Sequence, residues 1–129
     1  MRKEFALSSA GLGAAFDFIT DSVAREGGKE TVAQRLSVIV DEIFGNLMRH
    51  DGSLDERHRF TLELTDNGAG TVLVICDPGR PFNPLEPRLP CAPENGGYGL
   101  ELVRELSSSV SYERAGDCNR LTVSITAER

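Results

Sequence analysis

The spacing of hydrophobic residues predicts two helices in the first 50 residues of the chain. Apolar residues recur at helical spacing in "AGLGAAFDFITDSVARE" (residues 10–26), and the pattern stops at the Gly27-Gly28 pair. The strongest helical pattern is "KETVAQRLSVIVDEIFGNLMRH" (residues 29–50), which ends before Asp51-Gly52. At about 100° per residue, this segment has one broad apolar arc, formed by Val32, Leu36, Ile39, Val40, Ile43, Phe44, Leu47 and Met48. We expect it to be the central helix of the domain.

Shorter alternating patterns predict five strands and one further helix. The strands are "RKEFALS" (2–8), "RFTLELT" (59–65), "TVLVICD" (71–77), "SVSYERA" (109–115) and "NRLTVSITAE" (119–128), and the helix is "LELVRELS" (100–107). Asp66-Asn67-Gly68-Ala69-Gly70 and Gly116-Asp117 supply turn residues for two hairpins. This order of elements predicts an α+β two-layer sandwich, in which a mostly antiparallel mixed sheet carries the helices on one face.

The segment between Pro78 and Gly97 differs from the rest of the chain. It contains all six prolines and few apolar residues, so it has too many breakers for regular structure. It is also longer than a plain connection between elements. We therefore expect a functional loop here.

Length and composition limit the possible classes of protein. A chain of 129 residues fits one domain (1–129), and 40% hydrophobic with 26% charged residues is typical of soluble globular proteins. No apolar run approaches the roughly 18 residues that a membrane span needs. A net charge of −6 disfavours direct binding to nucleic acid, because phosphate contacts need clustered Lys and Arg. The three cysteines lack the spacing of a disulfide framework or a zinc site, which favours the reducing cytoplasm.

The central helix carries an acid, an amide and an imidazole at steps of four residues. Glu42, Asn46 and His50 lie along one edge of its apolar arc, next to the core and within reach of a cleft. A solvated polar flank is the alternative for Glu42 and Asn46. His50 could simply interact favourably with the C-terminal helix dipole.

The strand "TVLVICDPG" ends with a carboxylate followed by a glycine two residues later. Asp77 could accept a hydrogen bond from an exocyclic amino group such as adenine N6, and Gly79 would let a flat ring approach the backbone. The alternative is a simple Asp-Pro-Gly turn.

Three glycines, Gly96, Gly97 and Gly99, lie before the third predicted helix in "NGGYGLELVREL". Free backbone N–H groups and the helix dipole could receive a phosphate there, whereas a flexible hinge is the alternative. The segment is not the dinucleotide fingerprint, because no strand precedes it and Leu102 stands at the third glycine position. It is not a P-loop either, because no Gly-Lys-Ser/Thr follows.

The order of the three motifs resembles the GHKL superfamily of nucleotide-binding domains, which includes gyrase, heat-shock chaperones, histidine kinases and MutL. These domains have Glu-x-x-x-Asn on a helix, Asp-x-Gly after a strand, and Gly-x-Gly-Leu at the start of a helix. "DPGRPFNP", "GGYGLELVRELSSSVSYE" and "NRLTV" are similar to the small bacterial anti-sigma factor serine/threonine kinases, over nearly the whole chain.

The resemblance implies a role for each matching residue. Asn46 would coordinate the Mg²⁺ that bridges the ATP phosphates, and Glu42 would accept the proton of the attacking hydroxyl or orient a water. Asp77 would recognise the adenine amino group. The remaining contacts to the nucleotide are assigned to His50, Gly79, Gly97, Gly99, Leu100 and Thr122. Residues 78–96 match the lid over the nucleotide, from which Arg80 and Arg88 could reach a phosphate by charge and location alone.

Members of this family phosphorylate a small anti-anti-sigma (STAS-domain) protein and, in their other partner state, sequester a sigma factor. They usually act as homodimers. The lid of this chain departs from some members, because it has no Ser, Thr or Lys. A nucleotide-loaded binding module without significant transfer therefore stays open beside the kinase.

Overall fold

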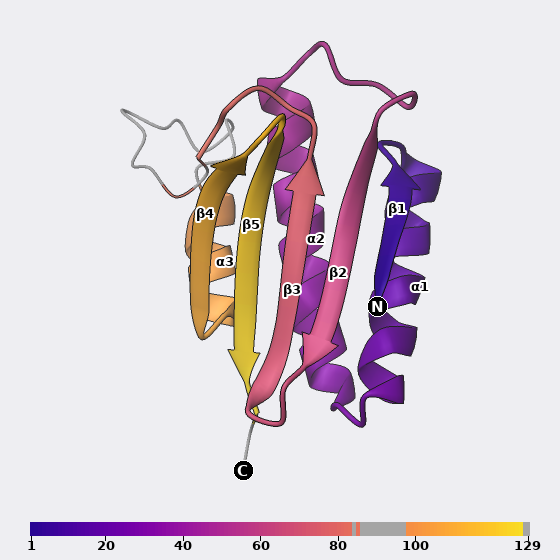
Figure 1. The fold of residues 1–129 in the computed structure, drawn as a ribbon, viewed down its shortest axis with the longest axis vertical. Helices are drawn as coiled ribbons and strands as arrows, with labels where there is room; N and C mark the ends of the chain where they lie inside the picture. Colours follow the sequence, from indigo (N-terminus) through magenta and orange to yellow (C-terminus); the bar gives the residue numbers. More distant parts are fainter. Residues whose placement is uncertain (84, 86–97, 128–129) are drawn as a thin grey trace.

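The computed structural model describes residues 1–83, 85 and 98–127. The elements in chain order are β1 (Arg2–Ala6), α1 (Ser9–Arg25), α2 (Glu30–His50), β2 (Arg59–Asp66), β3 (Gly70–Asp77), α3 (Tyr98–Leu106), β4 (Ser109–Ala115) and β5 (Cys118–Thr126). The strands form one five-stranded sheet in the order β1-β2-β3-β5-β4, and the three helices cover one face of it (Figure 1). The predicted two-layer α+β sandwich is confirmed.

The described strands pair only in antiparallel fashion, so the expected mixed sheet is a fully antiparallel one in this part of the chain. The β2–β3 hairpin has its turn where the sequence predicted it. Gly68 adopts a φ of +80°, which favours glycine, and the Asp66 and Asn67 side chains accept backbone N–H groups of the turn.

Residue alternation in β3 and β5 determines which side chains face the helices. In β3 the buried positions alternate with half-buried ones and end at Asp77. In β5 the buried positions begin at Asn119 and continue through Leu121, Val123 and Ile125. Asp77 and Asn119 are register partners, so an acid and an amide lie opposite each other on the helix-covered face.

Helix α2 lies against this face of the sheet (Figure 1), and residues of its apolar arc belong to the hydrophobic core. Leu36, Ile39 and Val40 are almost fully buried in the core. The helix ends at His50, and the next residue, Asp51, is its C-cap. The end of α2 therefore lies near the end of β3, where the candidate site is formed. Within the described ranges, every helix is too short or too polar to cross a membrane.

Candidate functional site

The polar edge of α2 lies where the helical pattern predicted it. Glu42 is half-buried, whereas Asn46 is buried with an exposed fraction of 3%. The Asn46 Oδ1 atom accepts a hydrogen bond of 2.8 Å from the Arg49 guanidinium. A buried side-chain amide needs hydrogen-bond partners, and Arg49 provides the donor for this oxygen. His50 is the last residue of α2, and its side chain lies outside the described part of the chain.

Asp77 ends β3 as a buried carboxylate, with an exposed fraction of 8%. Its Oδ1 atom accepts hydrogen bonds from the Gly79 backbone N–H (2.9 Å) and from Asn119 Nδ2 (3.0 Å). Within the described residues, Oδ2 accepts none. Burial raises the pKa of Asp77, although the bonds from Asn119 and Gly79 oppose this rise. The site therefore holds a carboxylate with one oxygen occupied and one available.

Gly79 is a position where a side chain would not fit without movement. A Cβ atom at this residue would lie 2.9 Å from Leu47 Cδ1 and 3.0 Å from Asp77 Oδ1. The space beside its Cα is thus filled by the end of α2 and by the carboxylate. The glycine brings the chain after β3 close to α2.

A cavity of about 30 Å³ lies between α2 and the ends of β3 and β5. Its described lining residues are Ile43, Asn46, Leu47, Asp77, Phe82, Tyr112, Asn119 and Leu121. The structure thus brings together two of the predicted site residues, Asn46 and Asp77, whereas Glu42 does not line this cavity. The volume is far below the ~300 to 1,000 Å³ of typical ligand pockets.

A second cavity of about 280 Å³ is adjacent to the first. Its described lining residues are Leu47, Asp51, Arg80, Pro81 and Phe82. Leu47 and Phe82 line both cavities.

The expected position of Thr122 in the site is wrong. Thr122 lies on β5 between the buried Leu121 and Val123, so its side chain projects from the opposite face of the sheet. Asn119 is the β5 residue that reaches Asp77, and sequence reasoning missed it. The alternation of side chains along a strand could have identified it. Asn119 is two positions from the apolar Leu121 and therefore shares its face, whereas Thr122 is three positions away and lies on the other face.

Asp51 is a second residue that sequence reasoning missed. Its buried carboxylate accepts the backbone N–H groups of Ser53 (3.0 Å) and Arg80 (3.0 Å), and also the Ser53 hydroxyl. The Ser53 hydroxyl and the Arg80 N–H hold the pKa of Asp51 below its usual range. The Arg80 guanidinium, predicted to reach a phosphate, lies 4.0 Å from the same carboxylate. Asp51 therefore anchors the chain that follows β3.

Part of the predicted phosphate-binding segment is described. Gly99 and Leu100 lie in the first turn of α3, which begins at Tyr98. Gly97 and Arg88 lie outside the described residues, as does most of the expected lid at 78–96.

The residues present fit a magnesium ion that is held together with phosphates. Among the described residues no cluster of three or more His, Cys, Asp or Glu could hold a metal ion. Mg²⁺ commonly uses only one or two protein oxygens and takes its other ligands from phosphates and water. The Asn46 Oδ1 atom could provide one such oxygen once Arg49 releases it.

A sequence profile described as histidine kinase-like ATPase domain matches residues 5–125. The chain therefore belongs to this family. No match was found among curated protein sequences.

Two solved structures share the fold at low sequence identity. One contains the RsbU and RsbW domains of Rv1364c from Mycobacterium tuberculosis, with a TM-score of 0.63 and 11% identity over 97% of this chain and 32% of that one. The other is the histidine kinase domain of the blue-light activated kinase EL346 from Erythrobacter litoralis, with a TM-score of 0.50 and 20% identity over 88% of this chain and 64% of that one. The present chain thus spans less than two thirds of either structure.

Proposed function

We propose that the chain is an ATP-binding anti-sigma factor with serine/threonine kinase activity. It would phosphorylate an anti-anti-sigma (STAS) partner and sequester a sigma factor in a partner switch. The observation that carries the proposal is the shared cavity of Asn46 and Asp77 in a histidine kinase-like ATPase domain. Similarity to a structure that contains an RsbW domain supports the anti-sigma assignment.

Each site residue has one role in this proposal. Asp77 accepts a hydrogen bond from the adenine amino group, and Asn46 holds Mg²⁺ through its amide oxygen. Bound Mg²⁺ neutralises charge that develops on the phosphates. Gly97 and Gly99 meet the phosphates through backbone N–H groups, and Gly99 lies in the first turn of α3, at the positive end of the helix dipole. His50, Gly79 and Leu100 complete the nucleotide contacts.

The proposed reaction is a transfer of the γ-phosphoryl group. The partner's hydroxyl oxygen forms the new bond to phosphorus, the bond to the ADP oxygen breaks, and Glu42 accepts the hydroxyl proton. A homodimer in the cytoplasm is proposed as the working form, with no direct contact to nucleic acid or membrane.

The second candidate is a regulatory module that binds ATP and a sigma factor or other protein without significant transfer. The composition of residues 78–96 favours it, because they provide no Ser, Thr or Lys to approach the γ-phosphate. In either case the choice of partner would depend on different affinities in different nucleotide states.

Labelled ATP separates the two candidates. The purified chain is incubated with Mg²⁺, γ-labelled ATP and a STAS-domain protein of the same organism. We expect label on the STAS protein with wild type, its loss with Glu42→Ala, and no change with Glu30→Ala, which removes an exposed glutamate from the first turn of the same helix. An unlabelled STAS protein despite ATP binding would reject the kinase and favour the binding module. Equal transfer by Glu42→Ala would remove the proposed base.

A further inference from the structure

Side chains from other elements bind the backbone of a four-residue segment, Gly79 to Phe82, which we call the strap. The Gly79 N–H donates to Asp77 (2.9 Å), the Arg80 N–H to Asp51 (3.0 Å) and the Phe82 N–H to Asn119 Oδ1 (3.1 Å). Pro81 has no N–H group. All backbone donors of the strap are therefore bound, by side chains in place of a regular secondary-structure ladder.

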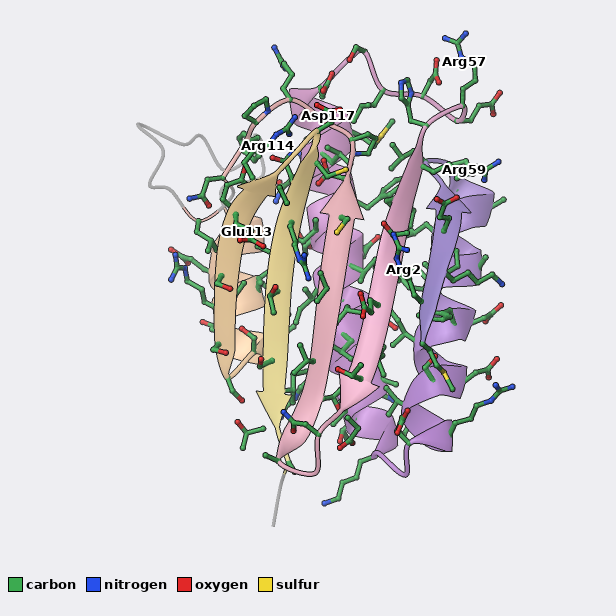
Figure 2. The ribbon with its side chains drawn as sticks, viewed as in Figure 1. Arg2, Arg57, Arg59, Glu113, Arg114 and Asp117 are labelled. Atoms are coloured by element: carbon green, nitrogen blue, oxygen red, sulfur yellow. The ribbon has the colours of Figure 1, made fainter. Side chains whose placement is uncertain are left out.

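Two strap carbonyls are bound as well. The Gly79 carbonyl accepts from Arg114 Nη1 (2.7 Å), and the Arg80 carbonyl accepts from Asn119 Nδ2 (2.8 Å). Arg114 projects from the end of β4, labelled in Figure 2, and thus belongs to an element far from the strap in sequence. Hydrogen bonds therefore connect the strap to β3, β4, β5 and Asp51, although it lies within the range expected for the lid.

Asn119 is the residue that joins the strap to the candidate base-binding carboxylate. Its Nδ2 atom donates both to the Arg80 carbonyl and to Asp77 Oδ1, which uses its two amide hydrogens. Its Oδ1 atom accepts from the Phe82 N–H, from the Tyr112 hydroxyl (2.6 Å) and from Arg114 (3.3 Å). A buried amide with all its groups satisfied has one defined orientation.

We propose that Asn119 is a positioning residue that sets the base specificity of the site by fixing Asp77 and the strap. This role rests on the proposed nucleotide binding. With Oδ1 occupied by Asn119 and Gly79, Asp77 keeps Oδ2 as the acceptor for a base amino group. An ionised carboxylate accepts only, so it favours an amino group and disfavours a carbonyl at the same place on the base. Hypoxanthine, the base of ITP, has a carbonyl where adenine has the amino group, and its neighbouring N1 atom carries a hydrogen.

The donor and acceptor halves of Asn119 can be tested separately. Asn119→Asp keeps the side-chain shape and an acceptor for Phe82 and Tyr112, but it loses the donor to Asp77 and to the Arg80 carbonyl. Asn119→Leu removes both halves. Arg120→Ala is the matched control, because Arg120 is the next residue of β5 and projects from the opposite face.

Binding of ATP and ITP to each purified 129-residue chain is measured by calorimetry. We expect wild type and Arg120→Ala to prefer ATP, and the preference to fall about tenfold in Asn119→Asp and in Asn119→Leu. Hydrogen exchange without nucleotide gives an independent readout, because the Phe82 amide should lose protection in Asn119→Leu and keep it in Asn119→Asp.

The possible outcomes separate this role from the proposed function. If wild type binds neither nucleotide, the proposed function fails and the specificity role with it. If wild type prefers ATP and both Asn119 variants keep the same preference, only the positioning role is overturned. Should both variants fail to fold, Arg114→Met removes a strap donor from an exposed side chain. An unchanged ratio in that variant would reject the contribution of the strap to base specificity.

Discussion

Replacement of Asp77 by asparagine should invert the base preference of the site while the fold survives. Both hydrogen bonds to the Asp77 side chain reach the same oxygen, Oδ1. An asparagine side chain can place its own oxygen there and keep both bonds. Its amide nitrogen then takes the place of Oδ2, which replaces an acceptor with a donor. The variant should therefore reject the adenine amino group and accept the carbonyl of hypoxanthine.

The expected magnitude follows from the loss of one buried hydrogen bond. Two donors that face each other leave a buried polar group unsatisfied, which costs about 1–3 kcal/mol and corresponds to roughly a 5- to 150-fold loss of ATP affinity. The stability of the nucleotide-free protein should instead increase in Asp77→Asn. Burial raises the pKa of Asp77 above its ordinary value of 3.8, so the ionised form destabilises the folded state at neutral pH. Asp77→Asn removes that cost.

The pH dependence provides a check on this reasoning. Above the raised pKa, Asp77 is ionised in both states and the variant should be the more stable protein. As pH falls through the raised pKa towards 3.8, the folded wild type takes up a proton before the unfolded chain does, so wild type gains stability and the difference narrows. Thermal unfolding of the nucleotide-free proteins between pH 7 and pH 4 measures this trend.

Asp66→Asn is the matched control for both measurements. Asp66 ends the neighbouring strand β2 and also accepts the N–H of the residue two positions later, at 2.8 Å, but it lies in a solvent-exposed turn. Asp66→Asn should change neither the ATP-to-ITP preference nor the pH dependence of thermal unfolding. An Asp77→Asn protein that is folded and keeps the wild-type preference would refute the assignment of Asp77 to the base.

Three further variants test the rest of the site. Gly79→Ala should lower the free energy of unfolding by no more than about 1 kcal/mol in chemical denaturation, because its Cβ would lie 2.9 Å from Leu47 Cδ1, the end of a flexible side chain that can shift; a much larger loss would mean that Leu47 cannot move. Asn46→Ala should lose the part of the ATP affinity that depends on Mg²⁺, so calorimetry with Mg²⁺ and with EDTA should give equal affinities; a remaining Mg²⁺ effect would exclude Asn46 as the metal ligand. Phe82→Ala should accelerate ATP association in stopped flow, because Phe82 lines both the cavity of about 30 Å³ and the cavity of about 280 Å³ and its truncation would widen them; an unchanged rate would show that Phe82 does not limit access.

The fold could be predicted because its signals are local. The helical arc of residues 29–50 and the alternation of residues 59–65 and 71–77 each fix the type of one element. The turn residues around Gly68 then fix the hairpin. The hairpin of β4 and β5 was also predicted from its turn residues, whereas the pairing of β5 with β3 depends on contacts between distant residues that no pattern within either strand specifies.

The site could be predicted only in part, for the same reason. Asn46 and Asp77 carry spacing and context that suggest chemistry, and the structure brings them to one cavity. Asn119 has no motif of its own, and its place opposite Asp77 comes from the register of β3 with β5. Asp51 looked like the end of a helix, yet its bond to the Arg80 N–H spans 29 positions of the chain. Contacts of this kind become visible only in three dimensions.

The two buried carboxylates beside Gly79 differ in their surroundings and therefore in what they can do. Asp51 has its charge stabilised by Ser53 and by the Arg80 N–H, so its pKa is lowered and its ionised form supports the fold. Asp77 is ionised at a net cost, because burial outweighs the bonds from Asn119 and Gly79. A nucleotide that donates a hydrogen bond to Asp77 Oδ2 would offset this cost. Because the free protein already bears the cost, its relief on binding would contribute to the affinity for the nucleotide. The strap connects the two acids, because Asp51 accepts the Arg80 N–H and Asp77 accepts the Gly79 N–H. The ionised Asp51 thereby stabilises the position of the backbone that binds Asp77.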